Sequence, residues 1–245
     1  STDGHLVMAY LFLKAQGLAG KPVADIRIDG AGKKVTRSDN CRVSDLSVSS
    51  DNLTFTYEAK SLPYPIDTSY YDNEKHTQAD ALSVISFMDE MNYEGLSVSG
   101  LSDGYYGLTI GGEFIGRFTA RELERGINMA LLQNTPQYKQ AMKIRQMNEE
   151  RWLKERKMRE FYWVEYNLMR KTGMLWACDE AAVDTLRKYR PHDIFLQWNG
   201  DLWLQYMHKG IREDCVNEQQ NLVDRIYEQN KPIPLRIEIK KFTDL

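Results

Sequence analysis

The sequence is short of cysteine, and the few that it has are isolated. Of 245 residues only Cys41, Cys178 and Cys215 are cysteines, and no two of them stand in a C-x-x-C spacing. This excludes the usual zinc frameworks and a ladder of disulfides. Thiols so spread out are expected to be free, although one bridge between two of them stays open, so cysteine usage indicates no compartment.

Long apolar runs and an excess of basic residues are also missing. The longest apolar stretch, "HLVMAYLFLKAQGL" at residues 5–18, is about one helix long and has no basic leader, so it predicts neither a membrane span nor a signal peptide. The net charge of −3 is unlike the strong basic excess of nucleic-acid scaffolds. We therefore expect no membrane span and no nucleic-acid partner.

The common cofactor and metal motifs are absent. There is no G-x-x-x-x-G-K-[ST] phosphate loop, and none of the four histidines (His5, His76, His192 and His208) stands in an H-x-x-x-H spacing. The sequence therefore predicts no cofactor and no metal site. The alternative that folding brings an aspartate to His192 or His208 stays open.

What the sequence does contain is a change of period half-way along the chain. Residues 4–16 are apolar on most sides of a helix, residues 22–58 and 96–119 alternate apolar and polar residues, and residues 78–92 have a helical pattern. Residues 61–77 have no period and predict a long loop. After Thr119 the pattern is helical until "PLRIEIKKF" at residues 234–242, where Lys240 and Lys241 suit an edge strand.

These patterns predict an α+β fold: an N-terminal helix, an antiparallel, sandwich-like β-rich first half, a helical second half with one long helix, and a final edge strand. Three parts are expected, with boundaries at residues 1–20, 21–118 and 119–245. Thr119 and Glu122 form a capping box, and Thr135-Pro136 opens the long helix, which has no clear stop before Gly173. Later breaks are expected at Pro191, at Asn199-Gly200 and at Pro232.

The stretch "GLSDG" at residues 100–104 matches the G-x-S-x-G pattern of nucleophile elbows. An elbow needs a helix directly after the serine, because the helix N-terminus helps to stabilise the oxyanion. Two alternating runs around Gly111-Gly112 follow instead, which is typical of a β-hairpin. We therefore interpret Ser102 as a turn residue and predict no catalytic residue in the chain.

The long helix is basic and aromatic. Over residues 136–172 it carries ten Lys and Arg against five Glu, with aromatic residues between them. Such a pattern can bind nucleic acid or sugars. The interpretation that we favour is a solvated face of Glu/Lys and Glu/Arg pairs over an aromatic packing face.

Two stretches resemble a known family. "GHLVMAYLFLKAQGL" at residues 4–18 resembles the last core helix of SGNH (GDSL-type) hydrolases, and residues 92–141 resemble the C-terminal region of a bacterial branch of that family. The resemblance implies a serine ester hydrolase. The family's Gly-Asp-Ser and Asp-x-x-His blocks are absent from the chain, which is therefore expected to be a truncated, C-terminal accessory portion that is inactive alone.

The same resemblance implies an exported enzyme acting on acylated carbohydrate, with Asn128, Asn134 and Gln137 as candidate substrate contacts. Helix capping and loop hydrogen bonds are the alternative role for these three side chains. Residues 4–16 are expected to pack against an upstream catalytic domain or a second copy of the chain. The rival hypothesis is a non-catalytic binding or assembly module that uses the aromatic helix to bind a glycan or a protein.

Overall fold

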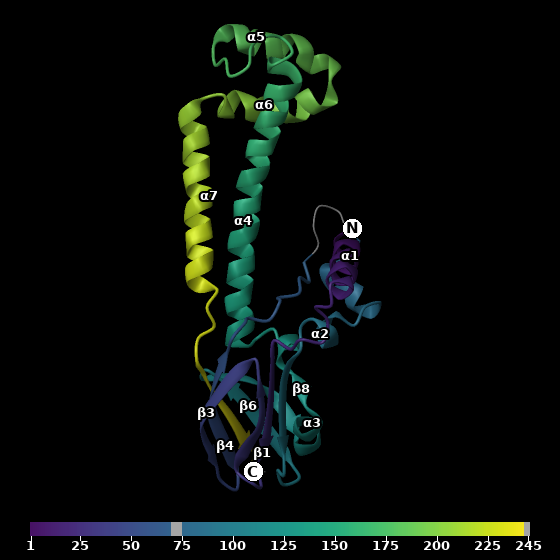
Figure 1. Cartoon of the computed structure of the whole chain (residues 1–245), viewed down its shortest axis with the longest axis vertical. Helices are drawn as coiled ribbons and strands as arrows, with labels where there is room; N and C mark the ends of the chain where they lie inside the picture. The colour runs from purple at the N-terminus through teal and green to yellow at the C-terminus, as the bar shows by residue number, and fades with distance from the viewer. Residues whose placement is uncertain (70–74, 243–245) are drawn as a thin grey trace. The chain divides into compact units, whose positions relative to one another are not determined.

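The computed structural model describes residues 1–69 and 75–242, which divide into two compact units (Figure 1). Unit 1 comprises Ser1–Lys143 and Gln229–Leu245, and unit 2 comprises Ile144–Glu228. The α+β class is confirmed: a helix, then mostly strands, then mostly helices and a last strand. The three-part division at residues 20 and 118 stays a prediction.

Unit 1 contains two sheets packed face to face. The first has the order β2-β1-β5-β8 and the second the order β3-β4-β9-β6-β7. Both contribute to one buried core, with Ile26 and Leu96 from the first sheet and Phe55, Leu108 and Ile237 from the second. The strands are β1 (Ala24–Asp29), β2 (Lys34–Asp39), β3 (Cys41–Val48), β4 (Asn52–Ala59), β5 (Glu94–Ser99), β6 (Tyr105–Ile110), β7 (Glu113–Thr119), β8 (Ile127–Asn128) and β9 (Leu235–Lys241).

Two details of the strand predictions are wrong. The strand pairs are not all antiparallel, because β1 pairs with β5 in parallel over its full length. The final strand β9 is not at an edge: Ile239 pairs with Leu53 of β4 on one side and with Leu108 of β6 on the other. The alternating Leu235, Ile237 and Ile239 are buried on the core side, and pairing with both β4 and β6 places β9 in the middle of its sheet.

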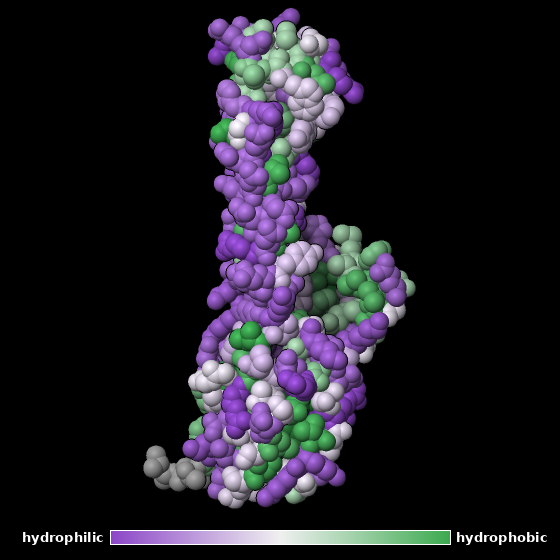
Figure 2. Space-filling model, turned by 60° about the vertical axis from the view of Figure 1, so that its left-hand side comes forward, coloured by the Kyte–Doolittle hydropathy of each residue, from purple (hydrophilic) through white to green (hydrophobic). Residues whose placement is uncertain are grey.

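The N-terminal helix α1 (Thr2–Ala15) is only partly covered by its own chain. Leu6 and Tyr10 are buried against the 3₁₀ helix η1 (Gln78–Ser83). The opposite side exposes Met8, Leu11 and Phe12, which are 61%, 56% and 64% exposed. Figure 2 shows the apolar surface gathered on this part of unit 1. The prediction that residues 4–16 need a partner therefore applies to one face of the helix.

Other helical segments of unit 1 are short. The predicted helix over residues 78–92 is divided into η1 and α2 (Phe87–Glu90). The predicted loop over residues 61–77 has no helix or strand in its described part, and residues 70–74 lie outside the described residues. The capping box at α3 (Ala120–Arg125) is confirmed, because the Glu122 carboxylate accepts the Thr119 N–H at 2.7 Å and the Thr119 hydroxyl accepts the Glu122 N–H. Next comes the 3₁₀ helix η2 (Met129–Leu131).

Unit 2 is a small helical bundle with its own core. The long helix α4 (Pro136–Val164) begins in unit 1 and ends in unit 2, where one π-helical turn, η3 (Glu165–Met169), continues it. Phe161, Val164, Met169, Leu186 and Trp203 are buried together. The remaining elements are α5 (Glu180–Tyr189), the 3₁₀ helix η4 (Arg190–His192), α6 (Ile194–Tyr206) and α7 (Lys209–Gln229).

The break predicted at Asn199-Gly200 is wrong, because α6 continues through both residues. A Cβ at Gly200 would lie only 3.1 Å from the Arg190 side chain, which crosses the helix here and pairs with Asp201 at 2.6 Å. Gly200 therefore serves a close side-chain approach within a helix, and it does not end the helix.

Exposed charges on α4 form i,i+4 pairs, such as Arg156 with Glu160 and Arg159 with Glu155. Figure 2 shows a mostly hydrophilic surface over α4 and α7. None of the described helices is long and apolar enough to cross a membrane. All three cysteines are free thiols: Cys41 and Cys215 are buried and Cys178 is exposed.

Candidate functional site

The three candidate contact residues lie in unit 1, where they have structural partners. Both ends of the Asn128 amide are used: its oxygen accepts the N–H groups of Glu94 and Ala130 at 2.9 and 3.1 Å. Its nitrogen donates to the carbonyl oxygens of Met88 and Asn92 at 3.0 and 3.3 Å. These bonds favour the capping and loop role for Asn128.

Asn134 and Gln137 do not lie at a common surface. Asn134 is exposed and donates to the Ile115 carbonyl oxygen at 2.8 Å. Gln137 is buried, and its amide nitrogen donates to a carboxylate oxygen of Glu94 at 3.2 Å. Gln137 and Asn128 thus both bond to Glu94, one at its side chain and one at its backbone. A role in substrate contact stays a prediction for all three residues.

Glu94 is the centre of a buried polar cluster that no sequence pattern indicated. It is fully buried at the start of β5, and the Tyr57 hydroxyl donates to the same oxygen as Gln137, at 2.8 Å. The other Glu94 oxygen and the Gln137 amide oxygen are buried without a hydrogen-bond partner. Burial raises the pKa of the Glu94 carboxyl to about 7, against the opposing effect of the two hydrogen bonds. The same burial and the Glu94 charge raise the pKa of Tyr57.

Ser102 lies in the connection between β5 and β6, and strand β6 follows it directly, as the hairpin interpretation requires. Its hydroxyl accepts a hydrogen bond from the Lys241 ammonium at 2.8 Å and lies 3.1 Å from the Tyr106 hydroxyl. Neither the helix nor the histidine of a nucleophile elbow is present at this position in the described chain. The Lys241 contact joins residues 139 apart, so no local pattern indicated it.

Unit 2 contains a buried carboxylate that organises its aromatic residues. Glu165, on the π-helical turn, is almost fully buried and accepts the Trp203 indole N–H at 2.8 Å and the Trp176 backbone N–H at 2.9 Å. Trp176 has φ of 64°, the left-handed region that a bulky residue rarely adopts. The Glu165 carboxylate thus holds a strained backbone and a core tryptophan in place.

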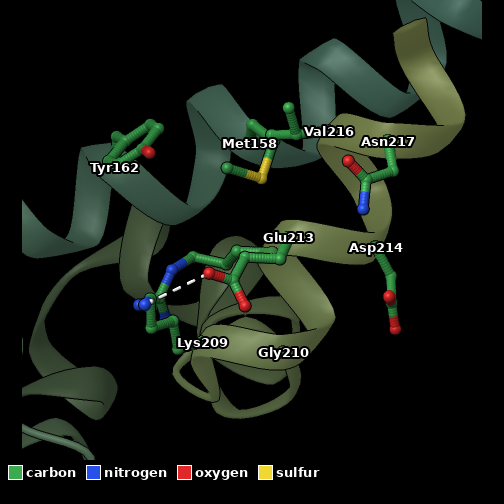
Figure 3. Close-up of a pocket in the computed structure, with 9 residues that line it drawn as sticks. Met158, Tyr162, Lys209, Gly210, Glu213, Asp214, Val216 and Asn217 are labelled. Atoms are coloured by element: carbon green, nitrogen blue, oxygen red, sulfur yellow. Dashed lines mark ion pairs between the residues drawn. The ribbon is translucent and has the colours of Figure 1, made fainter.

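One cleft of unit 2, of about 560 Å³, lies between α4 and the first turns of α7 (Figure 3). Met158 and Tyr162 from α4 face Lys209 and Glu213 from α7, which form an ion pair at 3.2 Å. Asp214 and Asn217 lie at its other end. The opposite charges of Lys209 and Glu213 compensate each other, so this cleft favours no particular charge on a ligand.

A second cleft, of about 420 Å³, is formed where the π-helical turn, the end of α5 and the start of α6 meet; we call it the Trp163 cleft. Trp163, Leu168, Lys171, Tyr189, His192 and Leu196 are among the residues that line it. Apolar and aromatic walls with a few polar groups are typical of small-molecule sites. In residues 1–69 and 75–242, no group of three or more His, Cys, Asp or Glu side chains is placed to hold a metal ion.

Comparisons with known proteins find one match to the helical unit and one to nearly the whole chain. Residues 142–231 match the family model of the diltiazem deacetylase C-terminal helical domain. A solved structure then matches the whole chain: BT4096, described as a gut microbial diltiazem-metabolizing enzyme, is 39% identical with a TM-score of 0.93 over 99% of this chain. The chain spans 55% of the length of that protein. No curated protein matches the chain.

These matches correct the family prediction. Neither is to an SGNH or GDSL hydrolase, so that resemblance is wrong, and with it the assignment as an accessory portion of such a hydrolase acting on acylated carbohydrate. The rival hypothesis of a glycan- or protein-binding module gains no support either. One apolar helix and a run of short strands recur in many unrelated folds, so likeness in such elements does not carry a function.

Proposed function

We propose that the chain forms part of an enzyme that removes acetyl groups from small molecules such as diltiazem. The observation that carries this proposal is the match to a diltiazem-metabolizing enzyme over 99% of the chain at 39% identity. At that identity and a TM-score of 0.93 the two units have the same folds as the corresponding part of BT4096. The deacetylase family model over residues 142–231 supports an acetyl group as the acyl group that is transferred to water, with the alcohol as the leaving group.

We further propose that the nucleophile of this reaction is not Ser102. A lysine ammonium donates to its hydroxyl, and no histidine is hydrogen-bonded to a serine within the described residues, so no general base is placed to accept the hydroxyl proton. Without a nucleophile at Ser102, the two units are proposed to bind and orient the substrate and to support the reacting groups.

The test is an assay of acetate release from diltiazem, with product detected by mass spectrometry. It uses the protein expressed from its full reading frame and, in parallel, these 245 residues alone. We expect the full protein to release acetate, Ser102→Ala to be as active as wild type, and the 245 residues alone to be inactive. Absence of deacetylation by the full protein contradicts the proposed function. Activity of the 245 residues that Ser102→Ala abolishes would instead make Ser102 the nucleophile.

We also propose that the exposed face of α1 packs against polypeptide outside these 245 residues. Met8, Leu11 and Phe12 are exposed together on that face, and contiguous apolar patches of this kind mark interaction surfaces. In the isolated chain the face is expected to drive self-association at tens of micromolar or below, on the order of affinity that one small apolar patch supports.

The double variant Leu11→Ser/Phe12→Ser is expected to reduce this self-association, measured by light scattering after size exclusion. Ile233→Ser is the matched control, since Ile233 is as exposed as Leu11 but lies outside α1. A wild-type chain that stays monomeric at all concentrations contradicts the proposal, as does an Ile233→Ser variant that dissociates equally well.

A further inference from the structure

The Trp163 cleft has an aromatic lining. The Trp163 ring packs on Phe195, with ring centroids 5.3 Å apart and planes tilted by 40°. Leu168 and Leu196, both buried, also line the cleft, and so does the half-exposed Tyr189 ring. The cleft thus offers a flat ligand apolar and aromatic surface.

Most polar groups at the cleft are already engaged. One Asp193 oxygen accepts the N–H groups of Phe195 and Leu196 at 2.8 and 3.2 Å, which uses this carboxylate to cap α6. The Asn167 amide donates to the Trp163 carbonyl oxygen at 3.0 Å, and the Thr172 hydroxyl donates to the Leu168 carbonyl oxygen. These three side chains therefore stabilise helices and offer little to a ligand.

Lys171 and His192 remain for a ligand. Within residues 1–69 and 75–242 Lys171 is exposed and has no carboxylate within ion-pair distance. The His192 ring likewise makes no hydrogen bond to a described residue. The Asp193 carboxylate also lines the cleft, but it is bound to the N–H groups at the start of α6, which offset its charge. The groups left to donate to a ligand are the Lys171 ammonium and the His192 ring, and such donors favour a negatively charged group.

The backbone conformation at the cleft also indicates a functional site. Leu168 belongs to the single π-helical turn of the chain's described part, Glu165–Met169. Such turns are rare, and they occur frequently at functional sites because the widened turn displaces side chains from the regular helical positions. The π-helical turn therefore supports a binding site here independently of the charges of Lys171 and His192.

We propose that the Trp163 cleft binds a planar aromatic molecule that carries one negative charge, such as an aryl carboxylate. The rings of Trp163 and Tyr189 contact the flat faces of the ligand, and Lys171, with His192, binds its carboxylate. This site goes beyond the proposed deacetylation, which by itself requires no anionic ligand. The cleft is large enough for a two-ring compound, since small-molecule sites begin at roughly 300 Å³.

The test is a calorimetric titration of the chain with 2-naphthoate. Two matched probes separate ring from charge: 2-naphthylmethylammonium has the rings with the opposite charge, and cyclohexanecarboxylate has the charge without an aromatic ring. We expect 2-naphthoate to bind at least about tenfold more tightly than either, a difference of about 1.4 kcal/mol. Equal binding of all three, or no binding of 2-naphthoate, overturns the proposal.

Two exposed substitutions locate the site. Lys171→Gln is expected to weaken 2-naphthoate about fivefold, as loss of one exposed ion pair implies, and Tyr189→Leu is expected to weaken it similarly. Lys157→Gln and Tyr227→Leu, exposed residues of unit 2 away from the cleft, are the matched controls and should bind like wild type. If the controls weaken binding as much as the cleft variants, the ligand binds elsewhere and the assignment is wrong. Circular dichroism checks that each variant is folded. Calorimetry measures binding directly, so the test does not depend on enzymatic activity.

Discussion

Replacing Glu165 with leucine is expected to lower the free energy of unfolding of unit 2 by about 3 to 5 kcal/mol. The substitution leaves the buried Trp203 indole N–H and the part-buried Trp176 backbone N–H without an acceptor, and an unsatisfied buried donor costs about 1–3 kcal/mol. It also removes the contact that holds Trp176 in the left-handed region, so the strained backbone there is no longer supported.

Glu165→Gln is expected to have an intermediate effect. The glutamine oxygen can still accept one of the two N–H groups, but its NH₂ group would face the other donor. Chemical denaturation followed by tryptophan fluorescence measures both variants. Glu155→Gln is the matched control, because Glu155 lies on the same helix in an exposed ion pair with Arg159, and such pairs contribute only about 0–1 kcal/mol. A Glu165→Leu variant as stable as Glu155→Gln would contradict the role given to this carboxylate.

The second expected result is that unit 1 loses stability as the pH rises from 4.5 to 7. The pKa of Glu94 is raised by burial from the ordinary 4.5 to about 7 in the folded chain. A raised pKa means that the folded state binds the proton more tightly than the unfolded state, so the stabilisation is complete below pH 4.5 and is lost as the pH passes through 7. A difference of about 2.5 pKa units corresponds to about 3 kcal/mol.

Glu94→Gln should remove this part of the pH dependence. The glutamine keeps an acceptor for the Tyr57 hydroxyl and has an NH₂ group for the Gln137 amide oxygen, which is otherwise unsatisfied. Urea denaturation at pH 5 and pH 8, followed by far-ultraviolet circular dichroism, measures the free energy of unfolding. The wild-type chain is expected to lose about 2 to 3 kcal/mol more between these two pH values than the variant. Glu124→Gln, at an exposed carboxyl of α3, is the control. Parallel pH profiles for wild type and Glu94→Gln would contradict the expectation.

The candidate site could be predicted from the sequence only in part. The aromatic and basic character of the long helix is visible as a pattern, and Trp163 and Lys171 belong to it. Their meeting with Tyr189 and His192 in one cleft depends on how α5 and α6 fold back, and the spacing of these residues does not contain that information. Asn128, Asn134 and Gln137 were singled out by their polar character, but two of them bond to Glu94, whose burial no local pattern indicates.

What the sequence by itself determined is local. The Thr119–Glu122 capping box, Thr135-Pro136 at the start of α4, the β6–β7 hairpin and the α+β class all follow from residues a few positions apart, because caps, turns and periodicity are short-range interactions. The tertiary structure decided the rest. The central position of β9 joins it to β4 across about 180 residues, β1 pairs in parallel with β5, and Gly200 stays helical under the Arg190 side chain.

The same division explains the chemistry. The burial of Glu94 and Glu165 is a property of everything that packs around each carboxyl and not of its neighbours in the chain, and for Glu94 this burial raises the pKa. Ser102 shows the contrast most directly. The five residues 100–104 match a catalytic pattern, but a strand follows where a helix is needed. The Lys241 ammonium, from near the C-terminal end of the chain, donates a hydrogen bond to the Ser102 hydroxyl. A motif fixes which groups are available, and only long-range packing decides which of them meet.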